Sequence, residues 1–224
     1  MRWSISEEKG LRLEIIYLDE IDSTHLFLVE ALKSGKLSPP IAVTSERQTG
    51  GVGSRGNRWI SLDGNLFLSF ALDNNYLPKD LPTVSRSIYF AMIMKGVLKE
   101  LGSGVWVKWP NDFYINNKKV GGVITKIFKN ITVCSMGLNI KEAPEGFAKL
   151  DINVNKNFIL KQFFINIELT PSWKEIFRKF KIEFQKGRNF SFHDGNIKYF
   201  IQNAVLNFDG SIELNNGKRI YNLR

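Results

Sequence analysis

The sequence has few of the residues that build metal centres and disulfides. Its 224 residues include one cysteine, Cys134, which excludes an intrachain disulfide. The two histidines, His25 and His193, are far apart and have no companions at the spacing of zinc ligands. Cys134 lies in the apolar run ITVCSMGL and is expected to be a small buried hydrophobic side chain. These shortages argue against a zinc protein and against a disulfide scaffold.

Long hydrophobic runs are also absent. No apolar stretch approaches the roughly 18 residues that a membrane-spanning helix needs. The amino-terminal segment MRWSISEEKGLRLEIIYL has acidic residues where a secretory signal would have its apolar region. The sequence therefore predicts a cytoplasmic protein without a membrane anchor.

Positive charge, in contrast, is abundant. The chain has 31 Lys and Arg against 22 Asp and Glu, a formal net charge of +9. The basic residues are spread along the chain and form no tail. This balance suits an ordinary solvated surface, a nucleic-acid partner, or an acidic partner or substrate, and charge alone does not choose among them.

Hydrophobic periodicity predicts an alternation of strands and helices. A helix is expected to begin at the cap-forming residues Asp22, Ser23 and Thr24 and to end at Gly35. The segment SWKEIFRKFKIEFQKG has the pattern of an amphipathic helix with a basic outer face, which favours packing on the domain over binding a membrane surface. Residues 141–170 have a weaker pattern. Further predicted elements are strands at 11–18, 41–46, 66–72, 105–109 and 131–140, a helix at 83–101, and a hairpin from Asp112 to Phe128 with an Asn-Asn turn.

The carboxy-terminal segment changes character. Short alternating stretches are separated there by DG and NNG, which predicts two or three small antiparallel strands. We therefore expect a larger domain over residues 1–188 and a small β domain over residues 189–224.

A glycine-rich stretch, SERQTGGVGSRGNRW at residues 45–59, is the most unusual local feature. It lacks the G-K-[ST] ending of a Walker A loop, and no helix follows its glycines as a dinucleotide fingerprint requires. Successive bare amides can bind an anion, two arginines add positive charge, and Trp59 offers a flat ring. A flexible surface loop is an equally good interpretation of this segment alone.

Three shorter stretches also contain residues that could take part in binding or catalysis. In KWPND (108–112), Lys108 ends a short strand, where a cation could neutralise a phosphate or a developing oxyanion, whereas Asn111 and Asp112 resemble ordinary turn residues. In KKVGGVI (118–124), paired glycines inside a strand indicate close approach of a ligand or of another backbone. In GLN (137–139), Asn139 could bind a nucleotide or cap the strand.

The order of these elements resembles the biotin protein ligase family. The matching segments are EIDSTH (20–25), RQTGGVGSRGNRW (47–59), KWPND (108–112), KVGGVI (119–124) and MGLNI (136–140). The resemblance implies an α+β fold, with a mixed, mostly antiparallel sheet flanked by helices as in class II synthetases, and a small all-β, SH3-like carboxy-terminal domain. The pattern begins by about residue 11, which resembles short forms without an amino-terminal helix-turn-helix repressor domain.

The resemblance also implies a two-step reaction. Biotin is activated by ATP, with Mg²⁺, to biotinyl-5′-AMP, and the biotinyl group then passes to a lysine of a biotin carboxyl carrier domain. Positioning and charge stabilisation would carry such chemistry, so no nucleophilic side chain is required. Specific DNA binding and membrane binding are not expected, and a homodimer is left open.

The resemblance assigns roles to particular residues. Lys108 would offset negative charge during adenylation, and no protein residue set would fix a metal, although Mg²⁺ could accompany ATP near Asn139. Biotin would contact Ser23, Thr24, His25, Gln48, Gly51, Val52, Gly53, Ser54, Lys108 and Gly122, and ATP or the adenylate would contact Arg55, Arg58, Trp59, Lys119 and Asn139.

The chain departs from the family pattern in its glycine-rich loop. The usual loop reads G-R-G-R-x-G-R-x-W, and Val52, Ser54 and Asn57 replace three of its arginines here. His25 stands where an asparagine commonly follows Ser-Thr. We hypothesise that Ser54 weakens the hold on the adenylate phosphate, because charge-assisted hydrogen bonds are about twice as strong as neutral ones.

Three other functions stay open at this point. A lipoate or octanoate ligase or transferase would share the fold, but its hallmark R-R-x-[ST]-G-G-G and a downstream H-D are absent. A nucleic-acid-binding module is compatible with the charge and with the basic helix over residues 172–188. A protein that binds biotin without adenylating it is disfavoured by the presence of Lys108 and Asn139.

Overall fold

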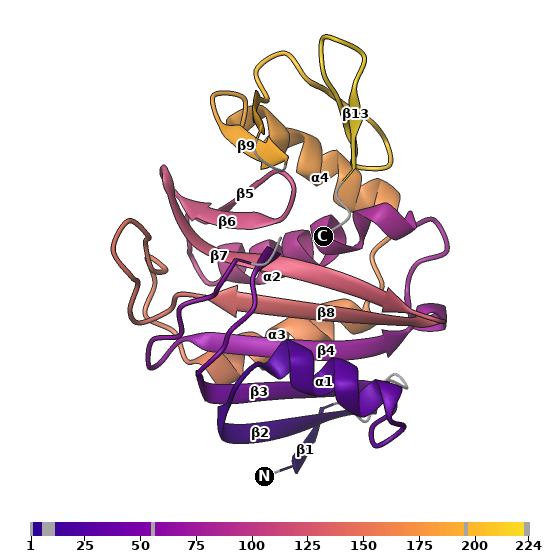
Figure 1. Cartoon of the computed structure of the whole chain (residues 1–224), viewed down its shortest axis with the longest axis vertical. Coiled ribbons are helices and arrows are strands. Elements are labelled where there is room, and N and C mark those ends of the chain that lie inside the picture. Colours follow the sequence, from indigo (N-terminus) through magenta and orange to yellow (C-terminus); the bar gives the residue numbers. More distant parts are fainter. Residues whose placement is uncertain (1, 6–11, 55–56, 195–196, 222–224) are drawn as a thin grey trace.

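A single eight-stranded sheet forms the centre of the protein. The computed structural model describes residues 2–5, 12–54, 57–194 and 197–221. The strands lie in the order β1-β2-β3-β4-β8-β7-β6-β5 (Figure 1). Only β2 and β3 run parallel, so the predicted mixed, mostly antiparallel sheet is confirmed. The strands are β1 (Arg2–Ile5), β2 (Leu13–Ile21), β3 (Ile41–Gln48), β4 (Leu66–Asp73), β5 (Trp106–Lys108), β6 (Asp112–Ile115), β7 (Lys118–Phe128) and β8 (Ile131–Leu138).

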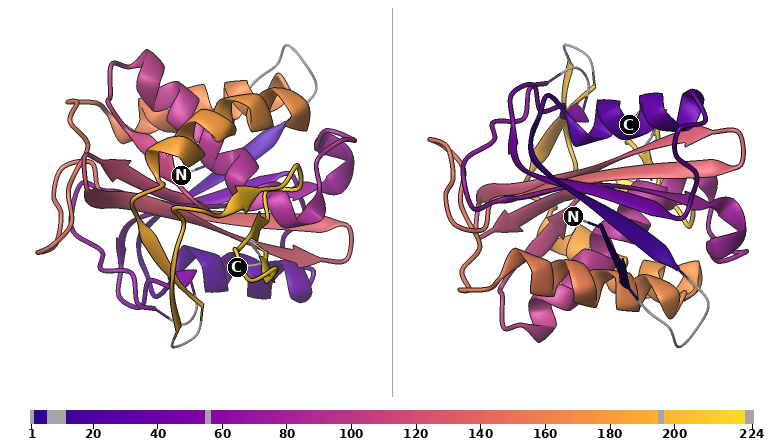
Figure 2. Two further views of the ribbon diagram at one scale, coloured as in Figure 1. Left: turned by 90° about the horizontal axis from the view of Figure 1, so that it is seen from above. Right: turned by 90° about the horizontal axis from the view of Figure 1, so that it is seen from below.

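Helices cover both faces of this sheet. Helix α1 (Thr24–Lys33) lies on one face, and α2 (Arg86–Glu100), α3 (Lys156–Glu168) and α4 (Trp173–Lys186) lie on the other (Figure 2). Two short 3₁₀ helices, Asn74–Tyr76 and Thr83–Ser85, precede α2. In the part of the chain that the structure describes, no helix combines the length and the hydrophobicity needed to cross a bilayer.

The central strands β4 and β8 carry different side chains on their two faces. Alternate residues point to opposite faces of a strand. Phe70 of β4 and Met136 of β8 belong to the large core beneath α2 and α3. The intervening positions on the α1 side include three small residues, Ser69, Ser135 and Gly137. Both faces of the sheet carry hydrophobic packing, and the α1 face also leaves room above these small residues.

The helix ends follow from local sequence. Ser23 caps α1, and its hydroxyl accepts a hydrogen bond from the Leu26 amide at 3.4 Å. Gly35 lies just beyond that helix with a φ of +72°, as expected of a glycine at a helix end. Ser172 and Glu175 form a capping box at the start of α4.

Helix α3 falls within residues 141–170, where no element was expected. Its signals are present in the sequence: Asn155 caps the helix by accepting from the Asn157 amide at 2.8 Å. Its buried side chains recur at helical spacing, at Ile159, Leu160, Phe163, Phe164 and Ile167. The core that these side chains join lies under the central strands.

A buried carboxylate holds α4 against the edge strand β5. Glu183 is 2% exposed, and its Oε2 accepts a hydrogen bond from the Val107 amide at 2.9 Å. Its Oε1 lies 3.3 Å from Lys95 Nζ and 3.2 Å from Lys186 Nζ. The two lysines and the amide together compensate the cost of burying this charge.

The carboxy-terminal segment forms two small antiparallel sheets. One contains β9 (Ser191–Asp194) and β10 (Ile197–Phe200), and the other contains β11 (Val205–Leu206), β12 (Ile212–Glu213) and β13 (Arg219–Ile220). This agrees with the expected all-β character, with more strands than the two or three predicted. Phe192 and Ile212 join the same core as the main sheet. The domain boundary between residues 188 and 189 stays a prediction.

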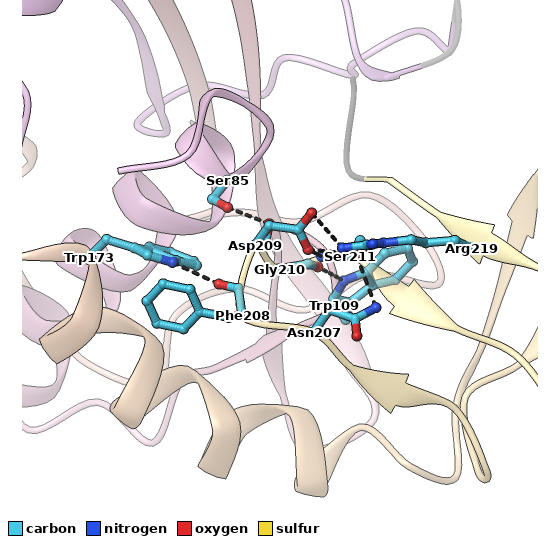
Figure 3. Close-up of polar contacts among 9 residues, drawn as sticks. All are labelled: Ser85, Trp109, Trp173, Asn207, Phe208, Asp209, Gly210, Ser211 and Arg219. Atoms are coloured by element: carbon cyan, nitrogen blue, oxygen red, sulfur yellow. Dashed lines mark hydrogen bonds and ion pairs between the residues drawn. The ribbon is translucent and has the colours of Figure 1, made fainter. Parts of the chain in front are cut away.

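Two tryptophans fix a turn of this segment to the main body (Figure 3). Trp109 donates its indole hydrogen to the Gly210 carbonyl at 2.8 Å, and Trp173 donates to the Phe208 carbonyl at 2.8 Å. Ser85 donates to the Asp209 carbonyl, so three consecutive carbonyls are held from the main body. Trp109 is therefore a buried structural residue of the KWPND stretch.

Replacing Gly210 by alanine should destabilise the protein more than the same change at Gly217. Both glycines have a φ of +77°, so both variants carry backbone strain of about 1 kcal/mol. A Cβ at Gly210 would also lie 2.6 Å from Ile88 Cδ1, whereas nothing lies within 4 Å at Gly217. We expect Gly217→Ala to cost about 1 kcal/mol and Gly210→Ala about 2–3 kcal/mol, because steric overlap is added. Urea denaturation measures both, and equal losses would contradict the packing of this turn.

Candidate functional site

A cavity opens on the α1 face of the sheet, above the small residues of β4 and β8. Its volume is about 50 Å³, so the cavity is small and partly open to solvent. The start of α1, the end of β3, the glycine-rich loop and strands β7 and β8 surround it. The residues predicted for the site that line it are Ser23, Thr24, His25, Gln48, Val52, Gly53, Ser54, Trp59, Lys119 and Gly122.

A continuous chain of polar side chains crosses the inner end of this cavity. Gln48 Oε1 accepts from the Thr24 amide at 2.9 Å and from the Thr24 hydroxyl at 3.0 Å. Ser69 Oγ lies 2.9 Å from Thr24 Oγ1 and 2.8 Å from Ser135 Oγ. His25 Nδ1 completes the chain at 2.7 Å from Ser135 Oγ. Four elements, α1, β3, β4 and β8, contribute to this one network.

His25 is held in its neutral form. Burial, and to a smaller extent the positive charge of Lys126, lower the pKa of this histidine to about 4. At neutral pH the cavity therefore presents an uncharged imidazole beside its hydroxyl groups.

The glycine-rich loop folds back on itself across the cavity. The Gly53 amide donates to the Asn57 carbonyl at 2.7 Å, and the Trp59 amide donates to the Gly51 carbonyl at 2.8 Å. A Cβ at Gly51 would lie 2.7 Å from the Trp59 carbonyl oxygen, so glycine permits this close approach. The described part of the loop thus makes defined backbone contacts with itself beside the cavity.

Trp59 packs its ring on the backbone of β8. A Cβ at Gly137 would lie 2.6 Å from Trp59 Cε2, so the indole requires a glycine at that position. The indole nitrogen is buried and has no hydrogen-bond partner among the described residues. The ring thereby forms one wall of the cavity.

Lys119 and Asp112 form an ion pair in the cavity. Their Nζ and Oδ1 atoms are 2.7 Å apart, with the two side chains 27% and 19% exposed. Gly122 leaves space for them, because a Cβ there would lie 3.0 Å from Asp112 Oδ1. The site thus holds a cation and its counter-ion beside the glycine-rich loop.

A bulge in β7 places Lys119 on this face. Asp112 pairs with Gly122 and Phe113 with Gly121, but Tyr114 pairs with Lys119, so the register skips Val120. An extra residue in one strand reverses the alternation beyond it. Lys119 therefore lies on the same face of the sheet as Asp112 and Gly122. Regular alternation along β7 would place Lys119 and Gly122 on different faces.

Other predicted site residues lie outside the cavity lining. Lys108 Nζ is 3.4 Å from Tyr114 Oη and 5.5 Å from the centre of the Phe190 ring, on the edge strand β5. Arg58 donates to the Thr49 carbonyl at 2.7 Å on the exposed side of the loop. Gly51 lies beneath Trp59. Arg55 falls outside the described residues.

Asn139 is buried next to the site rather than in its wall. Its Nδ2 donates to the Ala148 carbonyl at 3.1 Å, and its Oδ1 has no partner among the described residues. Asn111 also has a buried Oδ1 without such a partner, while its Nδ2 donates to the Val123 carbonyl. Within the described ranges, no group of three or more His, Cys, Asp or Glu could hold a metal ion.

Sequence reasoning missed four polar members of the site, one of which is Asn111, treated as a turn residue. Ser69 and Ser135 were treated only as strand residues, and Asp112 as a turn residue. Ser69 in LFLSFAL and Ser135 in ITVCSMGL each stand between two residues of the large core, so both serines face away from that core. A hydroxyl inside an apolar strand is a usable signal, because a buried hydroxyl requires a partner.

The stability of the protein should depend on His25 between pH 4 and 6.5. The unfolded chain has the ordinary histidine pKa of 6.5, and the folded chain has a pKa of about 4. The unfolded state binds the proton more readily in this window, so stability falls as the pH falls through it. The full shift corresponds to a loss of at most about 3 kcal/mol.

Urea denaturation at several pH values checks this dependence. We expect His25→Asn to lose less stability than the wild type between pH 6.5 and 4, because its side chain does not titrate. His193→Asn, which removes an exposed imidazole, is the matched control. If His25→Asn and wild type lose stability in parallel, the buried neutral imidazole is excluded.

Comparison with known proteins places these features in a family. A sequence model of the Biotin/lipoate A/B protein ligase family matches residues 17–140, which is more than half of the chain. The bifunctional ligase/repressor BirA of Escherichia coli is 34% identical over 115 residues, covering 50% of this chain and 35% of BirA. BirA of Bacillus subtilis is 27% identical over 149 residues, covering 62% and 45%. The chain thus matches less than half the length of these curated relatives.

Solved structures match over a larger part of the chain. The biotin acetyl coenzyme A carboxylase synthetase of Helicobacter pylori, with bound biotinylated ATP, has a TM-score of 0.88 at 37% identity. That match covers 92% of this chain and 98% of the other. The biotin protein ligase of Aquifex aeolicus, in complex with biotin and ATP, has a TM-score of 0.66 at 25% identity and covers 92% and 94%.

Proposed function

Because the chain belongs to the biotin/lipoate A/B protein ligase family, we propose that it is an ATP-dependent biotin–protein ligase. It activates biotin to biotinyl-5′-AMP and transfers biotin to a lysine of a biotin carboxyl carrier domain. The observation that carries the proposal is the Lys119–Asp112 ion pair inside a cavity covered by a glycine-rich loop. The similar Helicobacter pylori synthetase, which has biotinylated ATP bound, supports the same chemistry.

The polar chain suits the ring end of biotin. Thr24 and Ser135 line the inner end of the cavity beside Ser69, and their hydroxyl oxygens can accept hydrogen bonds from the N–H groups of a cyclic urea. The enclosed position excludes water, which strengthens such bonds. The carboxylate of the same ligand then extends toward Lys119 and the glycine-rich loop.

Lys119 is the cation that suits the adenylation step. The biotin carboxylate attacks the α-phosphorus of ATP in line, and pyrophosphate leaves with the displaced P–O bond pair. Lys119 Nζ, which Asp112 holds in the cavity, neutralises negative charge where the two anions meet. This proposal transfers to Lys119 the role first expected of Lys108, because Lys119 lines the cavity, whereas Lys108, opposite Asp112 on the edge strand, does not.

The adenosine and its metal ion have candidate neighbours in the same region. Trp59 offers an aromatic wall, and the unpartnered amide oxygens of Asn111 and Asn139 are hard donors of the kind that Mg²⁺ prefers. Mg²⁺, bound together with ATP, would balance phosphate charge there. In the second step, the acceptor lysine amine attacks the mixed anhydride and AMP leaves.

Substitution of Lys119 should abolish most of the activity. We expect Lys119→Met to lower kcat/KM for biotin-dependent ATP–pyrophosphate exchange by about 10²-fold or more, because one charge-stabilising group is lost. Lys118→Met, at the exposed neighbouring position, should retain near wild-type exchange. Lys108→Met should have a smaller effect than Lys119→Met. A larger loss at Lys108 would return the catalytic role to that lysine.

The same assay tests the choice of acid. Exchange with biotin, and not with lipoate or octanoate, is the expected result. Exchange that is supported by lipoate or octanoate but not by biotin would move the protein to the neighbouring branch of the family. Absence of exchange with all three acids would refute the ligase proposal.

The loop residue Ser54 should set how tightly the adenylate is held. Ser54 lines the cavity, and an arginine there would add charge-assisted hydrogen bonds to the adenylate phosphate. We expect Ser54→Arg to release biotinyl-5′-AMP about 10-fold more slowly than the wild type, corresponding to an interaction of about 1.4 kcal/mol. Release is followed with radiolabelled adenylate in a filter assay. Equal release rates would mean that Ser54 does not weaken retention.

A further inference from the structure

The hydrogen-bond chain at the inner end of the cavity can be assigned a direction. Gln48 Oε1 accepts from the Thr24 amide, so the carboxamide oxygen, and not its nitrogen, faces Thr24. That oxygen carries no proton, so the Thr24 hydroxyl must donate its single proton to it over 3.0 Å. The Gln48 end of the chain is therefore fixed.

Because each hydroxyl group has one proton to donate, the donor in each following contact is then determined. The Thr24 hydroxyl already donates its proton to Gln48, so its oxygen must accept from the Ser69 hydroxyl, 2.9 Å away. Ser69 in turn must accept from Ser135 over 2.8 Å, and Ser135 must accept from His25 Nδ1 over 2.7 Å. The three hydroxyl protons and one imidazole proton satisfy the four contacts. The opposite tautomer would leave one of these buried contacts without a proton, which is costly.

We infer that this chain makes His25 a specificity-determining residue: its neutral ring carries the proton on Nδ1 and offers Nε2 as an acceptor for an N–H group of the bound acid. His25 lines the cavity, and no hydrogen bond to its Nε2 is found within the described residues. The lowered pKa of His25 keeps this acceptor unprotonated at neutral pH. The inference rests on the proposed function.

An acceptor at this place discriminates between classes of acid. The cyclic urea of biotin has N–H groups, whereas the dithiolane of lipoate and the alkyl end of octanoate have none. A site with a buried acceptor rejects a ligand that cannot pair it, because the acceptor loses its hydration without compensation.

The tautomer can be observed directly, because the chain has only two histidines. Long-range ¹H–¹⁵N correlation spectra of ¹⁵N-histidine-labelled protein distinguish a protonated Nδ1 from a protonated Nε2. His193→Gln assigns the two rings, and it should leave the His25 signals and the KM for biotin unchanged. We expect His25 to carry its proton on Nδ1 in the free protein, and addition of biotin to shift the Nε2 resonance as it accepts a hydrogen bond.

Ser135→Ala tests the chain itself. Without that hydroxyl, the tautomer of His25 should move toward protonated Nε2. The KM for biotin in pyrophosphate exchange should rise about 3- to 10-fold, with the KM for ATP unchanged, which corresponds to one neutral hydrogen bond. A merely structural role of Ser135 would leave the tautomer unaltered.

Three results would overturn the inference. They are a protonated Nε2 in the free wild-type protein, an Nε2 resonance that biotin does not shift, or a Ser135→Ala variant that keeps the Nδ1 tautomer. Failure of the proposed function is distinguishable, because it would appear as absence of biotin-dependent exchange in the wild type, whereas the tautomer is read from the free protein.

Discussion

The contact between the Trp59 ring and the backbone at Gly137 is the constraint on which the candidate site depends. It requires a glycine in β8, because a Cβ would lie 2.6 Å from the indole. It also brings the end of the glycine-rich loop down onto the sheet, where the Trp59 amide donates to the Gly51 carbonyl. The loop is thereby closed over Lys119 and the hydroxyl groups of β4 and β8. A glycine of the loop and a glycine of β8 thus serve one arrangement.

Much of the fold could be predicted because its local signals agree with its tertiary structure. Ser23 caps a helix that the sequence also indicates by periodicity, and the strands at β4 and β8 alternate in the way their two environments require. Helix α3 was missed although Asn155 and a stripe of buried residues mark it. The error came from the surrounding weak pattern, and not from a lack of signal.

The site was harder to predict because the orientation of one lysine depends on a bulge. Both Lys108 and Lys119 stand next to recognisable segments, and nothing in their spacing distinguishes them. The skipped register at Val120 reverses the alternation of β7 and brings Lys119 beside Asp112. A bulge arises from pairing with a distant strand, so sequence periodicity does not report it. The polar chain through Ser69 and Ser135 likewise exists only once two strands are adjacent.

The buried carboxylate of Glu183 has a consequence for self-association. Sheet edges expose backbone amides that can recruit a strand from another molecule and so lead to aggregation. At β5, one such amide, that of Val107, is already occupied by Glu183 from α4, and the strand is only three residues long. A second copy of the chain therefore finds neither a free donor at Val107 nor a long template at this edge. Helix α4, which packs in the core, therefore also disfavours polymerisation of the protein through β5.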